Sequence, residues 1–173
     1  MHFLLMLWSL NVQPPAPKVI NTPFPKGERR DTTKNYIVLH YDASLNQKQT
    51  FRWLRRKRNS YHYFIRRDGT IHKLIDPKYQ ANHAGLSYWD GNVRMNRYSI
   101  GVCLQNDGKI DYTEKQYQSL QWLINIQKKR FHDITETRII GHSDIAIPRG
   151  RKPDPGDHFD WSRIGITRTN GEL

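Results

Sequence analysis

The sequence predicts an α/β domain in which a mixed central β-sheet is flanked by helices. Short apolar runs rich in β-branched and aromatic residues alternate along the chain with segments of helical periodicity. The resulting order is strand, helix, hairpin, strand, helix and strand, which is typical of a mixed sheet with helices packed against it. The length of 173 residues fits one domain, and five Trp and nine Tyr can fill its core.

The first half of this domain is expected to contain a strand, a helix and a hairpin. Residues 36–40 form an apolar run without alternation, which predicts a strand buried on both faces. Residues 47–58 have the spacing of a helix with one apolar side and one basic side. Two aromatic or β-branched runs, 61–65 and 71–75, flank Asp68-Gly69, and Asp-Gly between such runs predicts a hairpin.

The second half is expected to contain a long loop, two strands and a helix. In chain order these are a loop at 76–98, a strand at 99–104, a helix from about Thr113 to Phe131, and a strand at 137–140. Loops as long as the first of these are usually functional or disordered. Thr113 and Gln116 fit a capping box, in which the hydroxyl and the amide side chain each bond the other residue's backbone.

We divide the chain into an N-terminal arm (1–30), a folded domain (31–165) and a polar C-terminal tail (166–173). The arm starts with an apolar run at residues 3–8. This run is either a degenerate export signal, without a basic leader or a clear cleavage site, or a strand or helix packed on the domain. Pro14 to Pro17 predict an extended linker because proline lacks the amide donor. We expect no transmembrane segment, since no apolar run approaches the ~20 residues needed.

The formal charge of +12 favours partners that are polyanions. Nucleic acid, anionic lipid and the acidic bacterial wall all fit this condition, so charge does not choose between them. The basic cluster at residues 52–58, with Phe51 and Trp53 beside it, supports a nucleic-acid-binding alternative, although such helix faces are more often simply solvated. Cys103 is the single cysteine, so no intrachain disulfide can form.

Two histidines and one aspartate have the pattern of a catalytic metal site. His40 and His142 each end an apolar, strand-like run, and the ends of neighbouring strands converge at one edge of a sheet. Asp154 lies between two prolines, which restrict its backbone. Two neutral imidazoles and a carboxylate suit one Zn²⁺ ion, because three protein ligands leave a fourth position for water. Taken singly, each residue is more often structural, because most histidines at strand ends bind no metal and an Asp before Pro-Gly usually forms a turn.

Lys152 and Tyr61 are candidates for catalysis. Lys152 precedes Asp154 by two residues, so its ammonium group can stabilise an oxyanion beside the metal. Tyr61 opens the aromatic strand of the hairpin, and its hydroxyl can hydrogen-bond the attacking water or the oxyanion. The alternatives are a solvated loop lysine and a core aromatic residue with its hydroxyl at the surface.

Six motifs follow one another along about residues 34 to 161. They are Val38-Leu39-His40-Tyr41, Tyr61 to Thr70, His83-Ala84-Gly85, Asn96 to Val102, Gly141-His142-Ser143-Asp144-Ile145-Ala146 and Lys152-Pro153-Asp154-Pro155-Gly156. In this order they resemble the type 2 N-acetylmuramoyl-L-alanine amidases. That family includes phage lysozyme-type amidases, bacterial periplasmic and recycling amidases, and the animal peptidoglycan recognition proteins.

The resemblance implies an amidase domain at 31–165 with the amidase type 2, or peptidoglycan recognition protein-like, fold. It implies zinc-dependent cleavage of the amide between N-acetylmuramic acid and L-alanine. His40, His142 and Asp154 would be the zinc ligands, and Lys152 and Tyr61 would be catalytic. Intact peptidoglycan, released muropeptides and anhydro-muropeptides remain alternative substrates.

The same resemblance places substrate contacts in the loop at 76–98. His83 belongs to the stretch that borders the substrate groove in relatives, and we expect Asn82, Tyr88 and Trp89 to contact substrate with it. We also expect a monomer without a specific nucleic-acid partner. A periplasmic or secreted location is favoured, while cytoplasmic recycling and phage lysis remain open. A non-catalytic peptidoglycan-binding protein of the same fold is the alternative function.

Two positions depart from individual branches of the family. Cys103 occupies the place where many bacterial members carry a glutamate general base, so a carboxylate base there is in doubt. The phage-type branch also lacks this acid and keeps the tyrosine. Asp154 matches the third ligand of bacterial members, whereas phage and animal members use cysteine. The chain therefore combines features of the two branches.

Overall fold

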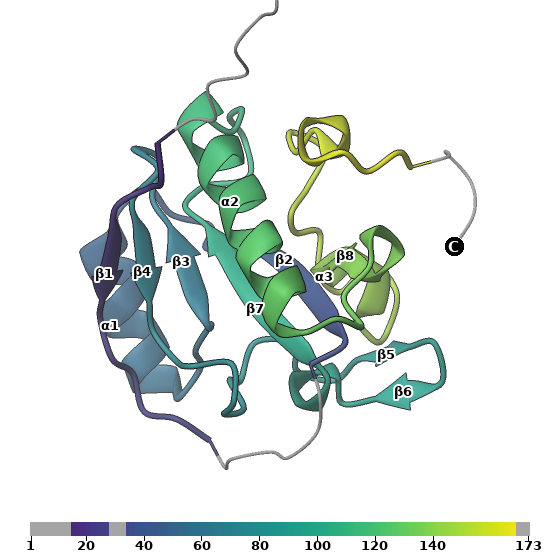
Figure 1. Ribbon diagram of the computed structural model, residues 1–173. Coiled ribbons are helices and arrows are strands. Elements are labelled where there is room, and N and C mark those ends of the chain that lie inside the picture. The colour runs from purple at the N-terminus through teal and green to yellow at the C-terminus, as the bar shows by residue number, and fades with distance from the viewer. Residues whose placement is uncertain (1–14, 28–33, 169–173) are drawn as a thin grey trace, which may run out of the picture.

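A six-stranded mixed sheet forms the centre of the computed structural model, which describes residues 15–27 and 34–168 (Figure 1). The strands are β1 (Val19–Asn21), β2 (Tyr36–Tyr41), β3 (Tyr63–Ile65), β4 (Ile71–Lys73), β7 (Ser99–Leu104) and β8 (Ile139–Gly141), in the spatial order β1-β4-β3-β7-β2-β8. The β3–β4 pair is antiparallel and all the other neighbours are parallel. The predicted mixed sheet is thus confirmed.

Helices cover both faces of this sheet. The helices are α1 (Gln47–Lys57), α2 (Glu114–Arg130) and the short α3 (His142–Ile145), and three 3-10 turns lie at Met95–Arg97, Glu136–Arg138 and Trp161–Ile164. In Figure 1, α2 crosses in front of the sheet and α1 lies behind it. None of the helices in the described ranges has the length and apolar character that crossing a bilayer requires.

Period-two alternation along the strands separates the two cores. Ile37 and Leu39 of β2 point toward α2, where they join the largest apolar cluster with Leu120. Phe64 of β3 points to the other face and packs with Phe51 of α1 at a ring-centroid distance of 5.1 Å. Successive strand residues face opposite sides of a sheet. Val38 and His40 of β2 therefore lie on the same face of the sheet as α1.

The predicted capping box at the start of α2 is confirmed. The Thr113 hydroxyl accepts from the Gln116 amide at 3.1 Å, and the Gln116 side-chain oxygen accepts from the Thr113 amide at 3.1 Å. α1 begins at an equivalent cap, where the Asn46 side chain accepts from the Gln49 amide at 3.2 Å. Both caps satisfy amides that the first turn of a helix leaves unpaired.

Several elements differ from the sequence prediction. Val19–Asn21, assigned to the arm, is an edge strand paired with β4. The last strand begins at Ile139 rather than 137, because 136–138 form a 3-10 turn, and the residues that follow start α3. The long loop contains a second, two-stranded sheet of β5 (Tyr88–Trp89) and β6 (Asn92–Val93). The apolar run at residues 3–8 lies outside the described residues.

The α1 face of the sheet and the loop over it bury several imidazoles. His40, His62 and His83 are nearly inaccessible to water. Burial, with a contribution from Lys34, lowers the pKa of His62 to about 3, and burial together with His142 lowers the pKa of His40 to about 4. Burial has the opposite effect on a carboxyl group and raises the pKa of Asp42 to about 6.

Leu120→Ala is expected to reduce the free energy of unfolding by about 2–5 kcal/mol, because Leu120 is fully buried between α2 and the sheet. Ile126→Ala is the matched control, since Ile126 lies on the same helix and is 39% exposed. Its expected effect is within about 0.5 kcal/mol. Urea denaturation measures both values, and equal losses in the two variants would contradict the assigned orientation of α2.

The metal-free protein is expected to be less stable at pH 4.5 than at pH 7. Because the folded-state pKa values of His62 and His40 lie below the unfolded value of 6.5, the unfolded chain binds more protons as the pH falls through that range. Asp42 acts with the opposite sign, since its folded pKa is raised, and offsets part of the loss. His83 adds to the loss, because burial lowers its pKa well below its ordinary value, so the balance is a net loss of stability. Urea denaturation with a chelator present tests this, and equal stability at the two pH values would contradict it.

Candidate metal centre and active site

The structure brings His40, His142 and Asp154 together. The His40 Nδ1 atom lies 3.1 Å from His142 Nδ1 and 2.9 Å from an Asp154 carboxylate oxygen, and His142 Nδ1 lies 3.0 Å from the same oxygen. All three side chains are buried. Within the described residues they form the one group of three or more His, Cys, Asp or Glu side chains close enough to share a metal ion.

Strand pairing explains how residues so distant in sequence meet. β2 and β8 are parallel neighbours in which Leu39 is opposite Gly141, so the next residue of each chain segment, His40 and His142, leaves the same edge of the sheet. The Asp154 loop is attached to this edge by a backbone hydrogen bond from the Ser143 amide to the Asp154 carbonyl, 2.9 Å long.

The outer ring nitrogens of the two histidines contact one short loop. His142 Nε2 donates to the Ala84 carbonyl at 3.0 Å, and His40 Nε2 lies 3.0 Å from Nδ1 of His83. Since a neutral imidazole that donates from Nε2 has its lone pair on Nδ1, the nitrogen that faces Asp154 is an acceptor. Metal-binding histidines commonly have their second ring nitrogen held in this way.

These hydrogen bonds make the inner side of the cluster rich in acceptors. Burial alone would raise the pKa of Asp154, but its short contacts with the His40 and His142 rings outweigh this effect and hold the pKa well below its usual range. Acceptor atoms about 3 Å apart with a carboxylate among them need a proton or a cation between them. Tetrahedral zinc bonds of about 2.0–2.2 Å place their ligand atoms roughly 3.4 Å apart, close to the observed separations. The donor set therefore fits one Zn²⁺ ion.

His83 lies against the sheet behind His40. Its Nε2 atom is 3.3 Å from the hydroxyl of Ser99, which donates to the Met95 carbonyl at 2.5 Å. A Cβ atom at Gly101 would lie 2.4 Å from the His83 ring, so this strand position requires glycine. The position of His83 indicates that it orients the His40 ring, and its predicted contact with substrate stays a prediction.

A cleft of about 580 Å³ opens beside the three ligands. Its lining comes from α1, from the loop after β2 and from the Asp154 loop, and it includes Trp53, Tyr61, Asn82, His83, Lys152 and Asp154. Lys152 is half-buried, and its positive charge contributes to the lowered pKa of His40. The Tyr61 ring centroid is 5.1 Å from that of His40. The two predicted catalytic residues therefore share the cleft with the candidate metal ligands His142 and Asp154.

Burial raises the pKa of the Tyr61 hydroxyl well above its ordinary value, with the nearby Cys103 and Asp154 adding to the effect. Tyr61 is consequently a neutral hydrogen-bond donor at physiological pH. Burial likewise raises the pKa of Cys103, which pairs with His40 across the β2–β7 ladder. A neutral, inaccessible thiol cannot replace a carboxylate base.

The remaining predicted substrate contacts lie in two places. Asn82 is exposed at the cleft and donates from its side chain to the Arg58 carbonyl at 3.2 Å. Tyr88 and Trp89, on β5, instead line a separate cavity of about 690 Å³ together with Tyr36 and Asp90. The structure thus brings Asn82 to the metal ligands and does not bring the two β5 aromatics there.

Asp42 and Trp53 line the cleft but were not predicted from the sequence. Asp42 accepts a hydrogen bond of 2.5 Å from the Thr50 hydroxyl. Asp42 follows His40 by two residues, and residues two apart in an extended chain face the same side. This spacing is the sequence signal that could have placed Asp42 beside His40. Trp53 is 51% exposed on α1. The sequence contains no signal that this exposed ring lines the cleft, because the cleft forms only when distant segments pack together.

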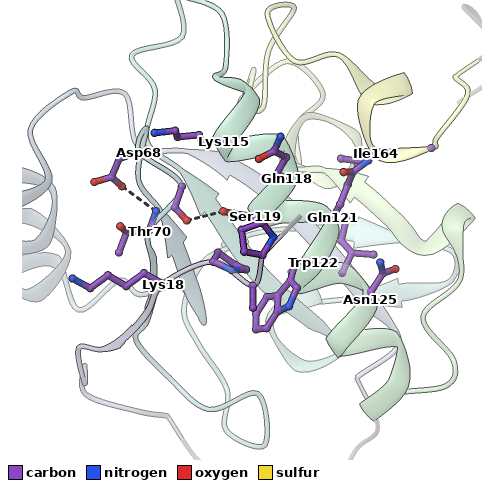
Figure 2. A pocket seen from close by; sticks show the side chains of 16 residues that line it. Lys18, Asp68, Thr70, Lys115, Gln118, Ser119, Gln121, Trp122, Asn125 and Ile164 are labelled. Atoms are coloured by element: carbon purple, nitrogen blue, oxygen red, sulfur yellow. Dashed lines mark hydrogen bonds between the residues drawn. The ribbon is translucent and has the colours of Figure 1, made fainter. Parts of the chain in front are cut away.

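A larger cavity, of about 800 Å³, lies elsewhere. Figure 2 shows it between the β3–β4 turn with Asp68 and Thr70, α2 with Trp122, and the segment around Lys18. Ser119 closes part of its wall by donating to the Gly69 carbonyl at 2.6 Å. None of the three candidate metal ligands lines this cavity, so cavity size alone does not identify the candidate active site.

Comparison with known proteins agrees with this geometry. The profile of the amidase type 2 family, described as N-acetylmuramoyl-L-alanine amidase, matches residues 30–157. The 1,6-anhydro-N-acetylmuramyl-L-alanine amidase AmpD of Haemophilus influenzae is 42% identical over 106 residues, which are 61% of this chain and 56% of that protein. The match therefore spans only a little over half the length of that relative.

Two solved structures are similar over most of the chain. The selenomethionine derivative of AmpD superposes with a TM-score of 0.72 and 29% identity, covering 88% of this chain and 95% of that chain. The Escherichia coli amidase AmiD, in complex with anhydro-N-acetylmuramic acid-L-Ala-D-γ-Glu-L-Lys, superposes with a TM-score of 0.68 and 30% identity over 81% and 62% of the two chains. Since the family profile covers most of the described domain and the fold agrees, this chain belongs to the type 2 N-acetylmuramoyl-L-alanine amidase family.

Proposed function

We propose that this protein is a zinc-dependent amidase that hydrolyses the amide bond between N-acetylmuramic acid and L-alanine. The observation that carries the proposal is the buried group of His40, His142 and Asp154, whose acceptor atoms converge beside an open cleft. These residues would hold the ion. When bound, Zn²⁺ supplies a Lewis acid and lowers the pKa of a water molecule to about 7.

The residues of the chain divide the remaining tasks. Lys152 extends a cation into the cleft, makes no hydrogen bond or ion pair with any described residue, and can stabilise the negative charge that develops on the amide oxygen. Tyr61 stays protonated and therefore acts as a donor, which orients the attacking water or the carbonyl oxygen. The cleft walls hold the substrate in register with these groups.

Muropeptide fragments are the substrates that the relatives favour. The AmpD relative is named for 1,6-anhydro-N-acetylmuramyl-L-alanine, and the AmiD structure contains an anhydro-muramyl tripeptide. These names give no support to the periplasmic or secreted location expected from the sequence. They agree better with the recycling role that was its alternative.

The two other functions considered from the sequence are less well supported. A non-catalytic peptidoglycan-binding protein of this fold would have no need of a complete ligand set, and all three ligands are in place. The basic face of α1 also has an explanation without nucleic acid. Trp53 and Thr50 of that helix line the cleft, so its cations lie where they can attract the carboxylates of a stem peptide.

His142→Ala is expected to abolish both stoichiometric zinc and hydrolysis, because it removes a ligand and leaves Asp154 with one imidazole partner. Mass spectrometry of a purified muropeptide, incubated with zinc-loaded or chelated protein, measures turnover, and elemental analysis measures zinc. His158→Ala is the control, since His158 is exposed and pairs only with Asp111 among the described residues. Full activity of His142→Ala would disprove the ligand assignment.

Lys152→Ala is expected to retain zinc and to reduce kcat about 10²-fold or more, as for loss of one oxyanion donor. Its control is Lys109→Ala, an exposed lysine outside the cleft. Steady-state kinetics on the same muropeptide separate kcat from KM. A change in KM alone would mean that Lys152 binds substrate without stabilising the transition state.

A further inference from the structure

The residues that follow the last 3-10 turn pack on the domain and contact the helix that begins with His142. The Arg168 guanidinium donates to both oxygens of the Asp144 carboxylate, at 3.0 and 2.6 Å. The same guanidinium stacks on Trp161 with its carbon 3.4 Å from the ring centroid. Ile166 packs on the main apolar cluster. The sequence assigned residues 166–168 to a polar tail. In the structure they are held on the domain by the Asp144 and Trp161 contacts of Arg168 and by the packing of Ile166.

Asp144 links this contact to the metal ligands. Its carboxylate accepts from the backbone amide of Gly141 at 2.6 Å, and this bond closes the turn that carries His142. The side chain is buried, with 5% of its surface exposed. Two more contacts join the turn to the third ligand, because Ser143 N donates to the Asp154 carbonyl and Gly141 leaves room for the Pro155 ring, which would lie 2.9 Å from a Cβ atom.

We propose that Arg168 is a positioning residue of the metal centre, which acts through Asp144 on the backbone that presents His142. This inference rests on the ligand set of the proposed function. A bidentate guanidinium bond fixes the rotation of a carboxylate as well as its place. Without it, the buried Asp144 would keep only the Gly141 amide at short range and would turn toward water. The His142 ring would then lose its alignment with His40 and Asp154.

Arg163 provides a matched control in the same segment. It also stacks on an aromatic ring, at 4.9 Å from the centroid of Tyr117, and pairs with the carboxylate of Glu114. Neither of these partners contacts a metal ligand. Arg163→Ala therefore removes a cation, a stack and an ion pair at comparable exposure, but leaves the Gly141–Asp144 turn unchanged.

The test is the affinity of the full-length apo-protein for Zn²⁺, measured by competition with a chromophoric chelator. Arg168→Ala is expected to weaken binding by about 10-fold or more, the effect seen when an outer-shell partner of a metal ligand is lost. Arg163→Ala is expected to stay within about twofold of the parent. Arg168→Lys keeps the charge but cannot form the two parallel bonds, so it should lie between the parent and Arg168→Ala, and it serves if the alanine variant fails to fold.

Thermal unfolding of the apo-proteins separates positioning from general stability. If Arg168→Ala lowers the apo melting temperature but binds Zn²⁺ as tightly as the parent, the role is structural and the inference is overturned. In Asp144→Asn, which retains an acceptor for Gly141, replacement of Arg168 should cause little further loss of affinity, because the pair acts as one unit. Independent losses would also overturn it. A parent protein that binds zinc but cleaves no muropeptide would refute the proposed function and leave this inference intact.

Discussion

The parallel pairing of β2 with β8 is the constraint on which the candidate site depends. It places the residues after Leu39 and Gly141 side by side, 102 positions apart in the chain. The strands themselves are apolar and buried, so the register is determined by the core rather than by the polar residues at the strand ends. The pairing of the strands brings the two imidazoles together, so no attraction between the rings is needed. The folding energy of the core can therefore hold an acceptor-rich cluster in place.

Hydrogen bonds outside the cluster determine what it can bind. Ala84 and His83 hold the outer nitrogens, so the inner nitrogens of His142 and His40 face an ionised carboxylate. Ser99 and Gly101 support this arrangement from the sheet, one by a hydrogen bond and the other by the absence of a side chain. The loop for which the sequence predicts substrate contacts thus also holds the outer nitrogens of the two candidate metal ligands.

Much of this architecture could be predicted from local patterns. The apolar runs of β2 and β7, the Asp-Gly hairpin and the capping box at Thr113 are signals contained in a few adjacent residues, and the structure has all of them. The ordered motifs selected His40, His142 and Asp154 as a group. β1 was missed because three residues at a sheet edge have little pattern of their own. The sequence predicts that Tyr88 and Trp89 contact substrate, but it does not reveal the β5–β6 pairing, which places them at a separate cavity. Their contact with substrate stays a prediction.

The candidate ligands His40 and Asp154 are separated by 114 positions, so the proposed metal ion would close a loop that contains most of the domain. Such an ion would have no preformed site in the unfolded chain, and its binding free energy would add to the stability of the whole fold. The sheet must pair fully before the ion can find three ligands, since the contacts that join them are among the most non-local in the molecule. Capture of the proposed ion would thereby follow pairing of the sheet, and the concentration of free zinc would become one of the quantities that determine how much of the protein is native.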